Sequence, residues 1–201
     1  MIITIEVGEI EVKFKYYLSG IGWATYIVEV NGQKLEFTAS YITDCLSDFL
    51  RSLMHLNSFC VPKDEIKKET ECEWEGEPEG IIWSFELKEN NILNIKAVYY
   101  EDEFSKDKTK TLIKTEYPYD DFIMIVLKEI DALIKRHGII GYREEWYDFD
   151  FPLTTFLKLK HYIIHKQKYP IQEVKGEFDI ETRSNLKFDL ELLLQEINNP
   201  S

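Results

Sequence analysis

The chain contains little of what marks membrane and exported proteins. No apolar run approaches the roughly 20 residues that span a bilayer. The first residues, "MIITIEVGEIEVKFKYY", alternate apolar and polar side chains, whereas an export signal places a basic end before an apolar core. The sequence therefore predicts a soluble protein with no membrane span and no export signal.

Cysteine is also scarce. The three cysteines, Cys45, Cys60 and Cys72, are odd in number, form no Cys-x-x-Cys pair and all lie in the first half of the chain. A disulfide framework uses paired cysteines in an oxidising compartment. This usage favours a reducing cytoplasm, and the place of Cys45 on an apolar helical stripe favours core packing over reactivity.

Nine glycines and four histidines supply few of the motifs that carry chemistry. There is no Gly-x-Gly-x-x-Gly or phosphate-loop run, which counts against the common nucleotide sites. There is also no Gly-x-Ser-x-Gly elbow and no His-Glu-x-x-His run, although catalytic groups assembled in space need no such motif. We expect no bound cofactor.

His161 and His165 are the only candidate metal ligands among the histidines. They stand four residues apart on a predicted helix, so both could face one ion. A zinc site needs a third protein ligand, and "HYIIHK" supplies no glutamate inside the pair. The sequence therefore favours two partly exposed surface histidines over a metal site.

Negative charge dominates the chain. Lys and Arg number 24 against 37 Asp and Glu, which gives a formal net charge of -13 at pH 7. A chain with this charge repels nucleic acid and anionic lipid, which are also negative. The charge is suited to a basic protein partner, or it serves only to keep the protein soluble.

Apolar residues make up 44% of the chain and aromatic residues 14%, enough for a substantial core. We expect residues 1–201 to form a single α+β domain of antiparallel hairpins and meanders with about four packed helices. The runs "TIEV", "IEVKFKYY" and "GWATYIVEV" alternate as strands, and Asn31-Gly32 predicts a hairpin. An amphipathic helix follows, with Tyr41 and Ile42 opening its apolar stripe.

The second half of the chain is expected to hold most of the helices. A Glu-Asn-Asn turn at 89–91 predicts another hairpin, "TLIKTEY" a strand, and residues 119–137 a helix that ends before Gly138. Residues 138–152 are expected to connect it to a helical region at 151–199, where a last amphipathic helix is spaced by Leu186, Leu190, Leu193, Leu194 and Ile197. The segments 21–57 and 80–137 echo one another weakly as hairpin-then-helix units.

The stretch "ECEWEGEPEG", residues 71–80, places a glutamate at every second position. If it is extended, Glu71, Glu73 and Glu75 share one face, while Cys72 and Trp74 point to the other. Gly and Pro residues after position 75 are expected to end the strand. Its acidic face could dock a partner, protect a sheet edge or simply contact water. It is poorly suited to Ca²⁺, because carboxylates on a flat strand do not converge on one ion.

A second acidic stretch, "REEWYDFDF" at 143–151, combines carboxylates with aromatic rings. A pair of carboxylates in an aromatic cleft performs glycoside hydrolysis, but the two groups must face each other across a substrate. Adjacent acids on one connection rarely do so. The structural interpretation is that the aromatics pack this connection onto the core and that Arg143 pairs with a nearby acid.

The order of Tyr41-x-x-Asp44, "WEGEPEG", Trp83 and "GYREEWYDFDFP" resembles an uncharacterised bacterial protein family of unassigned function, over roughly residues 23–165. That family brings no established catalytic residues. In size, acidity and expected architecture the chain also resembles the immunity proteins of bacterial toxin systems. This resemblance implies a non-enzymatic protein that neutralises a basic toxin.

We therefore expect a cytoplasmic, non-enzymatic, acidic protein-binding protein. Glu71, Glu73 and Glu75 would attract its basic partner, and Trp74, Trp146 and Tyr147 would be the aromatic anchors. The alternative is a small hydrolase or metal-dependent enzyme that uses carboxylates of 144–150 with His161 or His165. The sequence leaves the oligomeric state open.

Overall fold

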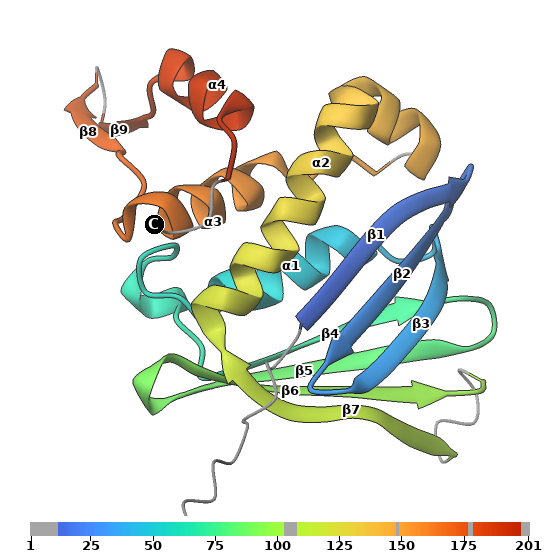
Figure 1. The fold of residues 1–201 in the computed structure, drawn as a ribbon. Coiled ribbons are helices and arrows are strands. Elements are labelled where there is room, and N and C mark those ends of the chain that lie inside the picture. The colour runs from blue at the N-terminus through green and yellow to red at the C-terminus, as the bar shows by residue number, and fades with distance from the viewer. Residues whose placement is uncertain (1–11, 103–107, 148, 177–178, 198–201) are drawn as a thin grey trace, which may run out of the picture.

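A computed structural model describes residues 12–102, 108–147, 149–176 and 179–197. Within them the chain forms two antiparallel sheets, a separate two-stranded hairpin and four helices, so the fold is α+β as predicted. Figure 1 shows the strands of the two large sheets crossing one another, with α1 and α2 against them and the C-terminal elements grouped at one end.

The first sheet has the order β1 (Val12–Gly20), β2 (Trp23–Val30) and β3 (Gln33–Ser40). Asn31 and Gly32 both adopt left-handed backbone conformations, with φ of 51° and 74°, between β2 and β3. Two-residue turns of this kind match the twist of the flanking strands. The predicted hairpin is confirmed, while the strand predicted at "TIEV" lies outside the described residues.

Helix α1 (Cys45–His55) starts later than the apolar periodicity predicted. Asp44 takes the non-helical cap position, so the helix cannot include the residues before it. Tyr41 and Ile42 are therefore exposed outside the helix, and their prediction as part of its buried stripe was wrong. The stripe begins at Cys45.

The second sheet has the order β4 (Glu69–Glu75), β5 (Gly80–Lys88), β6 (Ile92–Tyr100) and β7 (Thr109–Pro118). One short 3-10 turn, Lys63–Glu65, precedes β4, and another, Glu89–Asn91, joins β5 to β6. The second predicted hairpin and the predicted strand at β7 are both confirmed.

Helix α2 (Tyr119–Trp146) is broken at Gly138, whose φ of 69° and ψ of 170° are not helical. The predicted helix end at this glycine is correct, but the chain resumes a helical course directly after it. Tyr142 and Trp146, four residues apart, are buried on this last part, so core packing keeps it helical. Of the predicted connection at 138–152, residues 139–146 are therefore helical, and only Tyr147 and 149–152 lie outside helices among the described residues.

The C-terminal region consists of α3 (Leu153–His165), β8 (Gln172–Lys175), β9 (Ile180–Arg183) and α4 (Leu186–Leu194). The two short strands form a hairpin that the sequence did not predict. Asn185 caps α4 by accepting hydrogen bonds from the amides of Lys187 and Phe188. We call the β8–β9 hairpin the arm, since it stands away from the two large sheets (Figure 1).

Trp74 stands at the centre of an aromatic core. Its ring centroid lies 3.8 Å from that of Tyr26, 5.0 Å from Phe49 and 5.8 Å from Trp83. Aromatic pairs in such offset and edge-to-face arrangements contribute about 0.5–1.5 kcal/mol each beyond their area burial. The first sheet, α1 and the second sheet are thus joined through this one indole.

Helix α1 and the chain before it cover the outer edge of β4. The Ser52 hydroxyl donates to the Glu71 carbonyl at 3.3 Å, and the Glu75 amide donates to Oγ1 of Thr43 at 3.4 Å. An open edge strand presents unpaired backbone groups to which another chain can add. Side chains from the α1 region occupy that position here.

The outer edges of β1 and β7 are covered as well. The Glu129 carboxylate of α2 accepts from the Tyr16 amide at 3.4 Å and from the Lys15 ammonium at 2.8 Å. On β7, the Gln33 side chain accepts from the Lys114 amide at 2.7 Å and donates to the Lys114 carbonyl at 3.2 Å. The Gln33 side-chain amide thus occupies one position of the β7 edge.

Candidate functional site

Strand β4 has the two-faced pattern that the sequence predicted. Cys72 and Trp74 are buried on one side, while Glu71, Glu73 and Glu75 lie on the other. Glu71 accepts a hydrogen bond from the Ser84 hydroxyl at 3.3 Å on the neighbouring strand. The three glutamates therefore share one face. A hollow of about 520 Å³ opens on this face beside Glu69, Glu71, Glu86 and Lys96, but among the described residues no three acidic side chains are placed to hold a metal ion.

Two of the three predicted aromatic anchors belong to the core. Trp74 and Trp146 have 0% exposure, so a partner cannot contact either indole in this conformation. The alternation of β4 buries Trp74, and helical spacing in α2 buries Trp146 on the same side as Tyr142. The prediction of these two indoles as anchors was wrong. Tyr147 is 51% exposed and remains accessible.

The histidine pair does not form a metal centre. His161 is buried, contrary to the prediction of a surface residue, with its ring 4.7 Å from His165 and 5.2 Å from Tyr169 between centroids. Burial lowers the pKa of His161, and the nearby His165 lowers it further. In the described part of the chain, no group of three His, Cys, Asp or Glu side chains is placed to hold a metal ion.

The carboxylates of 144–150 lie away from these histidines. Glu144 is exposed on the last turns of α2, Asp150 is bound to Arg143 at 2.9 Å, and Asp148 is outside the described residues. The predicted pairing of Arg143 with a local acid is thus confirmed. His161 stands on the third turn of α3, about 12 Å along the axis from its start. The described acids and histidines therefore do not meet in one cleft.

The three thiols are all free and buried. Burial raises the pKa of Cys45 and of Cys60 to about 12, and raises that of Cys72 further. A thiol in this state is a poor nucleophile because the thiolate is the reactive form. The predicted packing of Cys45 in the core is confirmed, since its side chain is fully buried in α1.

Exposed aromatic and aliphatic side chains gather where three separate segments meet. The β1–β2 turn, the β3–α1 connection and the end of α2 supply them. We call this surface the aromatic patch, made of Ile21 (69% exposed), Trp23 (36%), Tyr41 (42%), Ile42 (51%) and Tyr147 (51%).

Two contacts hold the aromatic patch together. The Gly22 amide donates to the Glu145 carbonyl at 2.8 Å, which fixes the β1–β2 turn to α2. The rings of Tyr41 and Tyr147 lie 4.6 Å apart between centroids. Gly22 also has φ of 76°, and a Cβ built on it would stand 2.8 Å from the Tyr41 ring, so this turn needs glycine. The patch is therefore a defined surface.

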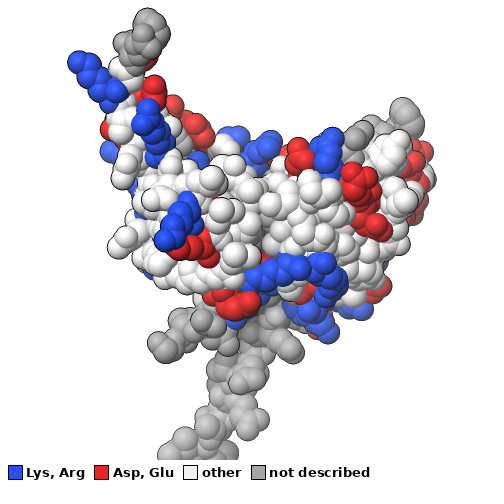
Figure 2. Space-filling view, turned by 90° about the horizontal axis from the view of Figure 1, so that it is seen from above, with Lys and Arg blue, Asp and Glu red and all other residues white. Residues whose placement is uncertain are grey.

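The segments around the aromatic patch are acidic. Residues 39–45, 75–80 and 141–147 carry six acidic side chains, one, three and two respectively, and a single basic one, Arg143. The Glu75 amide contact to Thr43 places the end of β4 beside the patch. Figure 2 shows acidic side chains at the margin where β1, β2 and the end of α2 lie in Figure 1.

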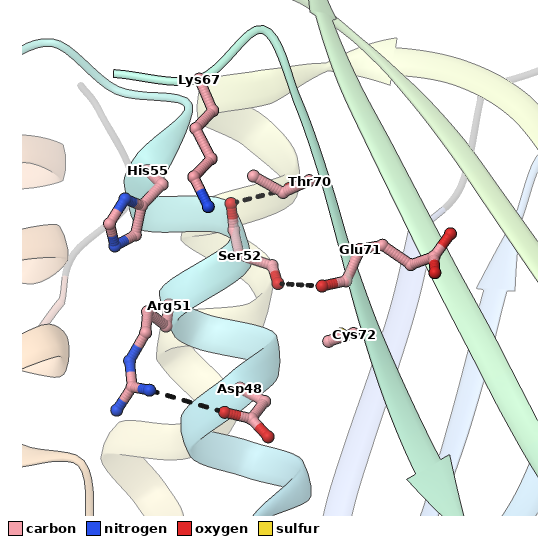
Figure 3. Close-up of a pocket in the computed structure, with 8 residues that line it drawn as sticks. All are labelled: Asp48, Arg51, Ser52, His55, Lys67, Thr70, Glu71 and Cys72. Carbon is pink, nitrogen blue, oxygen red and sulfur yellow. Dashed lines mark hydrogen bonds and ion pairs between the residues drawn. The ribbon is translucent and has the colours of Figure 1, made fainter. Parts of the chain in front are cut away.

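A polar hollow of about 200 Å³ lies between α1 and β4, and we call it the α1–β4 hollow (Figure 3). Three of its side chains are basic and come from two segments. Its lining consists of Asp48, Arg51, Ser52, His55, Lys67, Thr70, Glu71 and Cys72. It brings Glu71 of the predicted site together with residues that the sequence did not single out for function.

A longer groove runs along the base of the arm. Two adjoining hollows of about 340 and 660 Å³ share Lys158, Tyr169, Ile171 and Thr182. Its one carboxylate near α4, Asp189, already accepts from the Tyr169 and Ser184 hydroxyls at 2.7 Å. Its lining is mixed apolar and polar, and it also includes the Glu173 carboxylate and the ammonium groups of Lys158 and Lys168.

No family model, curated protein or solved structure gives a significant match to this chain. None of the helices in the described residues has the length and apolar content needed to cross a membrane. The function must therefore be argued from the geometry of the surfaces described above.

Proposed function

We propose that this protein is a non-enzymatic binding protein that docks a basic protein partner on the aromatic patch. The observation that carries the proposal is the meeting of Trp23, Tyr41 and Tyr147, all exposed, from three distant segments. Trp and Tyr are the residues most enriched among those that dominate protein–protein binding energy. An exposed cluster of them, fixed by backbone contacts, is suited to such a role.

Charge favours a basic partner. The patch is flanked by acidic segments, and the chain as a whole carries -13 at pH 7. Such a field accelerates the approach of a cationic protein and slows that of an anionic one. The glutamates of β4 contribute to this attraction, since Glu75 ends the strand beside the patch.

The covered sheet edges favour docking through side chains. β4, β1 and β7 have edge groups bonded to side chains of Ser52, Glu129 and Gln33. A partner that adds a strand at β1, β4 or β7 would have to displace these contacts. Neutralisation of a basic toxin in the cytoplasm, in the manner of an immunity protein, is the form of this function that size, acidity and the α+β fold favour.

The test is affinity capture from the native host with the tagged chain, followed by mass spectrometry and titration of the purified partner. Ile21→Asp alters the patch, and Ile180→Asp on the arm is the matched control because both residues are highly exposed. We expect a partner of pI above about 9. Its binding should weaken with salt, drop at least tenfold with Ile21→Asp and persist with Ile180→Asp.

Two results would overturn the proposal. One is a stoichiometric partner that is acidic. The other is a partner that binds Ile21→Asp as tightly as the unaltered protein, because the patch then takes no part.

A further inference from the structure

The α1–β4 hollow gathers positive charge in an acidic protein. Arg51 and His55 stand one turn apart on α1, and Lys67 comes from the segment that leads into β4. The Lys67 amide donates to the His55 carbonyl at 2.9 Å, which fixes the two segments to each other. Figure 3 shows the three basic side chains on one side of the hollow, with the Glu71 carboxylate turned to the opposite side of β4.

These basic groups are only partly neutralised. Lys67 makes no ion pair with another described residue. Arg51 has one carboxylate neighbour, Asp48, at 3.7 Å, and both side chains are about half exposed, 57% and 44%. An exposed pair at this distance contributes little, so most of the guanidinium's donors are available to a ligand.

His55 is oriented by its own hydrogen bond. Its Nδ1 lies 3.1 Å from the Glu65 carbonyl, which can only accept, so Nδ1 carries the hydrogen. Nε2 is then the ring atom left for a ligand. It accepts from the P–OH group of a phosphate monoanion while the ring is neutral, and it donates to a phosphate oxygen only as imidazolium. The Ser52 and Thr70 hydroxyls donate to the Glu71 and Ser52 carbonyls, at 3.3 and 3.0 Å, and make the wall of the hollow rigid.

We propose that the α1–β4 hollow binds a phosphate monoester. A phosphate group offers several strong acceptor oxygens in different directions, which suits the Arg51 guanidinium and the Lys67 ammonium from two segments, with the His55 imidazole beside them. The volume of about 200 Å³ is below the range of roughly 300–1,000 Å³ usual for larger ligands, so only the phosphate and its ester linkage fit inside. The rest of the ligand projects into solvent.

This site is separate from the aromatic patch. The patch borders the start of α1, whereas Arg51 and His55 lie two to three turns along the same helix. The protein's overall charge of -13 opposes anions at long range, so binding here depends on short contacts. Loss of partner docking and loss of phosphate binding are therefore distinguishable outcomes.

The experiment is titration of the full chain with inorganic phosphate, O-phosphoserine and unmodified serine, followed by amide NMR spectra. We expect saturable shifts confined to the amides of 48–55 and 65–72, from phosphate and O-phosphoserine but not from serine. Lys67→Ala and Arg51→Ala should each weaken binding at least tenfold. Lys63→Ala, an exposed lysine outside the hollow, and Ile21→Asp should leave it unchanged.

The proposal fails if phosphate causes no saturable shifts in these segments, or if Lys67→Ala and Arg51→Ala bind it as the unaltered chain does. Tighter binding of O-phosphoserine than of inorganic phosphate would support a protein-borne phosphate, and the reverse order a small free ligand. A circular dichroism melt of each variant excludes loss of fold as the cause of weaker binding.

Discussion

Lys160 is a buried cation whose three donors are all used. It has 0% side-chain exposure and donates to the Asp131 carboxylate at 2.5 Å and to the Leu193 and Gln195 carbonyls at 3.1 and 2.6 Å. Those carbonyls lie at the C-terminal end of α4, where no further helical amide is present to donate to them. One ammonium on α3 therefore fixes α4 to α2. The sequence offered no sign of this, because Lys160 resembles the other lysines of its helix.

Replacing Lys160 by methionine should destabilise the protein by about 3 kcal/mol, because two buried carbonyls lose their donor and Asp131 keeps only Lys135, at 2.7 Å. Urea unfolding followed by circular dichroism measures this loss. Lys158→Met, two residues away and only partly buried, is the control and should change stability by less than about 0.5 kcal/mol. Adding Asp131→Leu to Lys160→Met should recover part of the lost stability. Equal stabilities for Lys160→Met and Lys158→Met would contradict the role of Lys160 as a buried link between α4 and α2.

The surroundings of Asp44 disfavour the charged form of its carboxyl group. Burial, helped by the nearby Asp48 charge and opposed by Ser47 and Arg51, raises its pKa from 3.8 to about 6. A folded-state pKa above the unfolded value means that the folded protein binds the proton more tightly. Stability is then lost as pH rises through the window from about 4 to about 6.

Asp44→Asn should therefore be more stable than the unaltered chain at pH 7 and less dependent on pH between 4 and 6. The Asp44 side chain makes no capping hydrogen bond to α1, and asparagine is equally common at this position, so α1 keeps its start. Thermal melts across this pH range provide the comparison, with the exposed Asp64→Asn as control. A lower melting temperature for Asp44→Asn at pH 7 would mean that the carboxylate is needed in its charged form.

At the scale of elements, local turn chemistry was the best guide. The Asn31-Gly32 hairpin and the turn at 89–91 carry residues that adopt left-handed conformations, and both were predicted. The arm was missed because its four-residue strands are almost fully exposed and show no alternation. Helix α4 was predicted to exist, but its leucine spacing did not show which leucines are buried.

Leu186, Leu190 and Leu194 form an exposed stripe on α4, at 70%, 51% and 71%, whereas Leu192 is buried. Leu192→Ala should therefore cost about 2–5 kcal/mol through lost packing. Leu190→Ala on the same helix should change stability by less than about 0.5 kcal/mol. Urea unfolding distinguishes the two, and a larger cost for Leu190→Ala would mean that the 186–190–194 stripe is the buried face.

At the scale of the whole molecule, the candidate surfaces could not be predicted from the sequence. The aromatic patch joins residues 21–23, 41–42 and 147, and only tertiary packing brings them together. One feature of the sequence did point to the patch. The run "GIGW" at 20–23 places isoleucine and tryptophan at a turn, where polar residues are usual, and so indicates exposed apolar side chains. The net negative charge follows directly from the sequence, but the clustering of acidic side chains beside the patch depends on where β4 ends.

The net charge of -13 also predicts how salt acts on the fold. Raising NaCl from about 0.01 M to about 0.1 M shortens the screening length from about 30 to about 10 Å. Repulsion among the excess carboxylates should weaken, so the melting temperature should rise. Tetramethylammonium chloride should give the same rise if screening is the cause. A fall in both salts would show that local ion pairs such as Lys15–Glu129 dominate.

The three buried thiols can be used to measure local unfolding of the chain. Because none of them reacts while covered, a thiol reagent labels this protein only as fast as the relevant region unfolds. Cys45 and Cys72 lie between α1 and the sheets, while the Cys60 thiol contacts the Lys158 carbonyl of α3 at 3.7 Å. Labelling followed by mass spectrometry therefore separates the release of the C-terminal helices from the unfolding of the aromatic core, without any introduced probe.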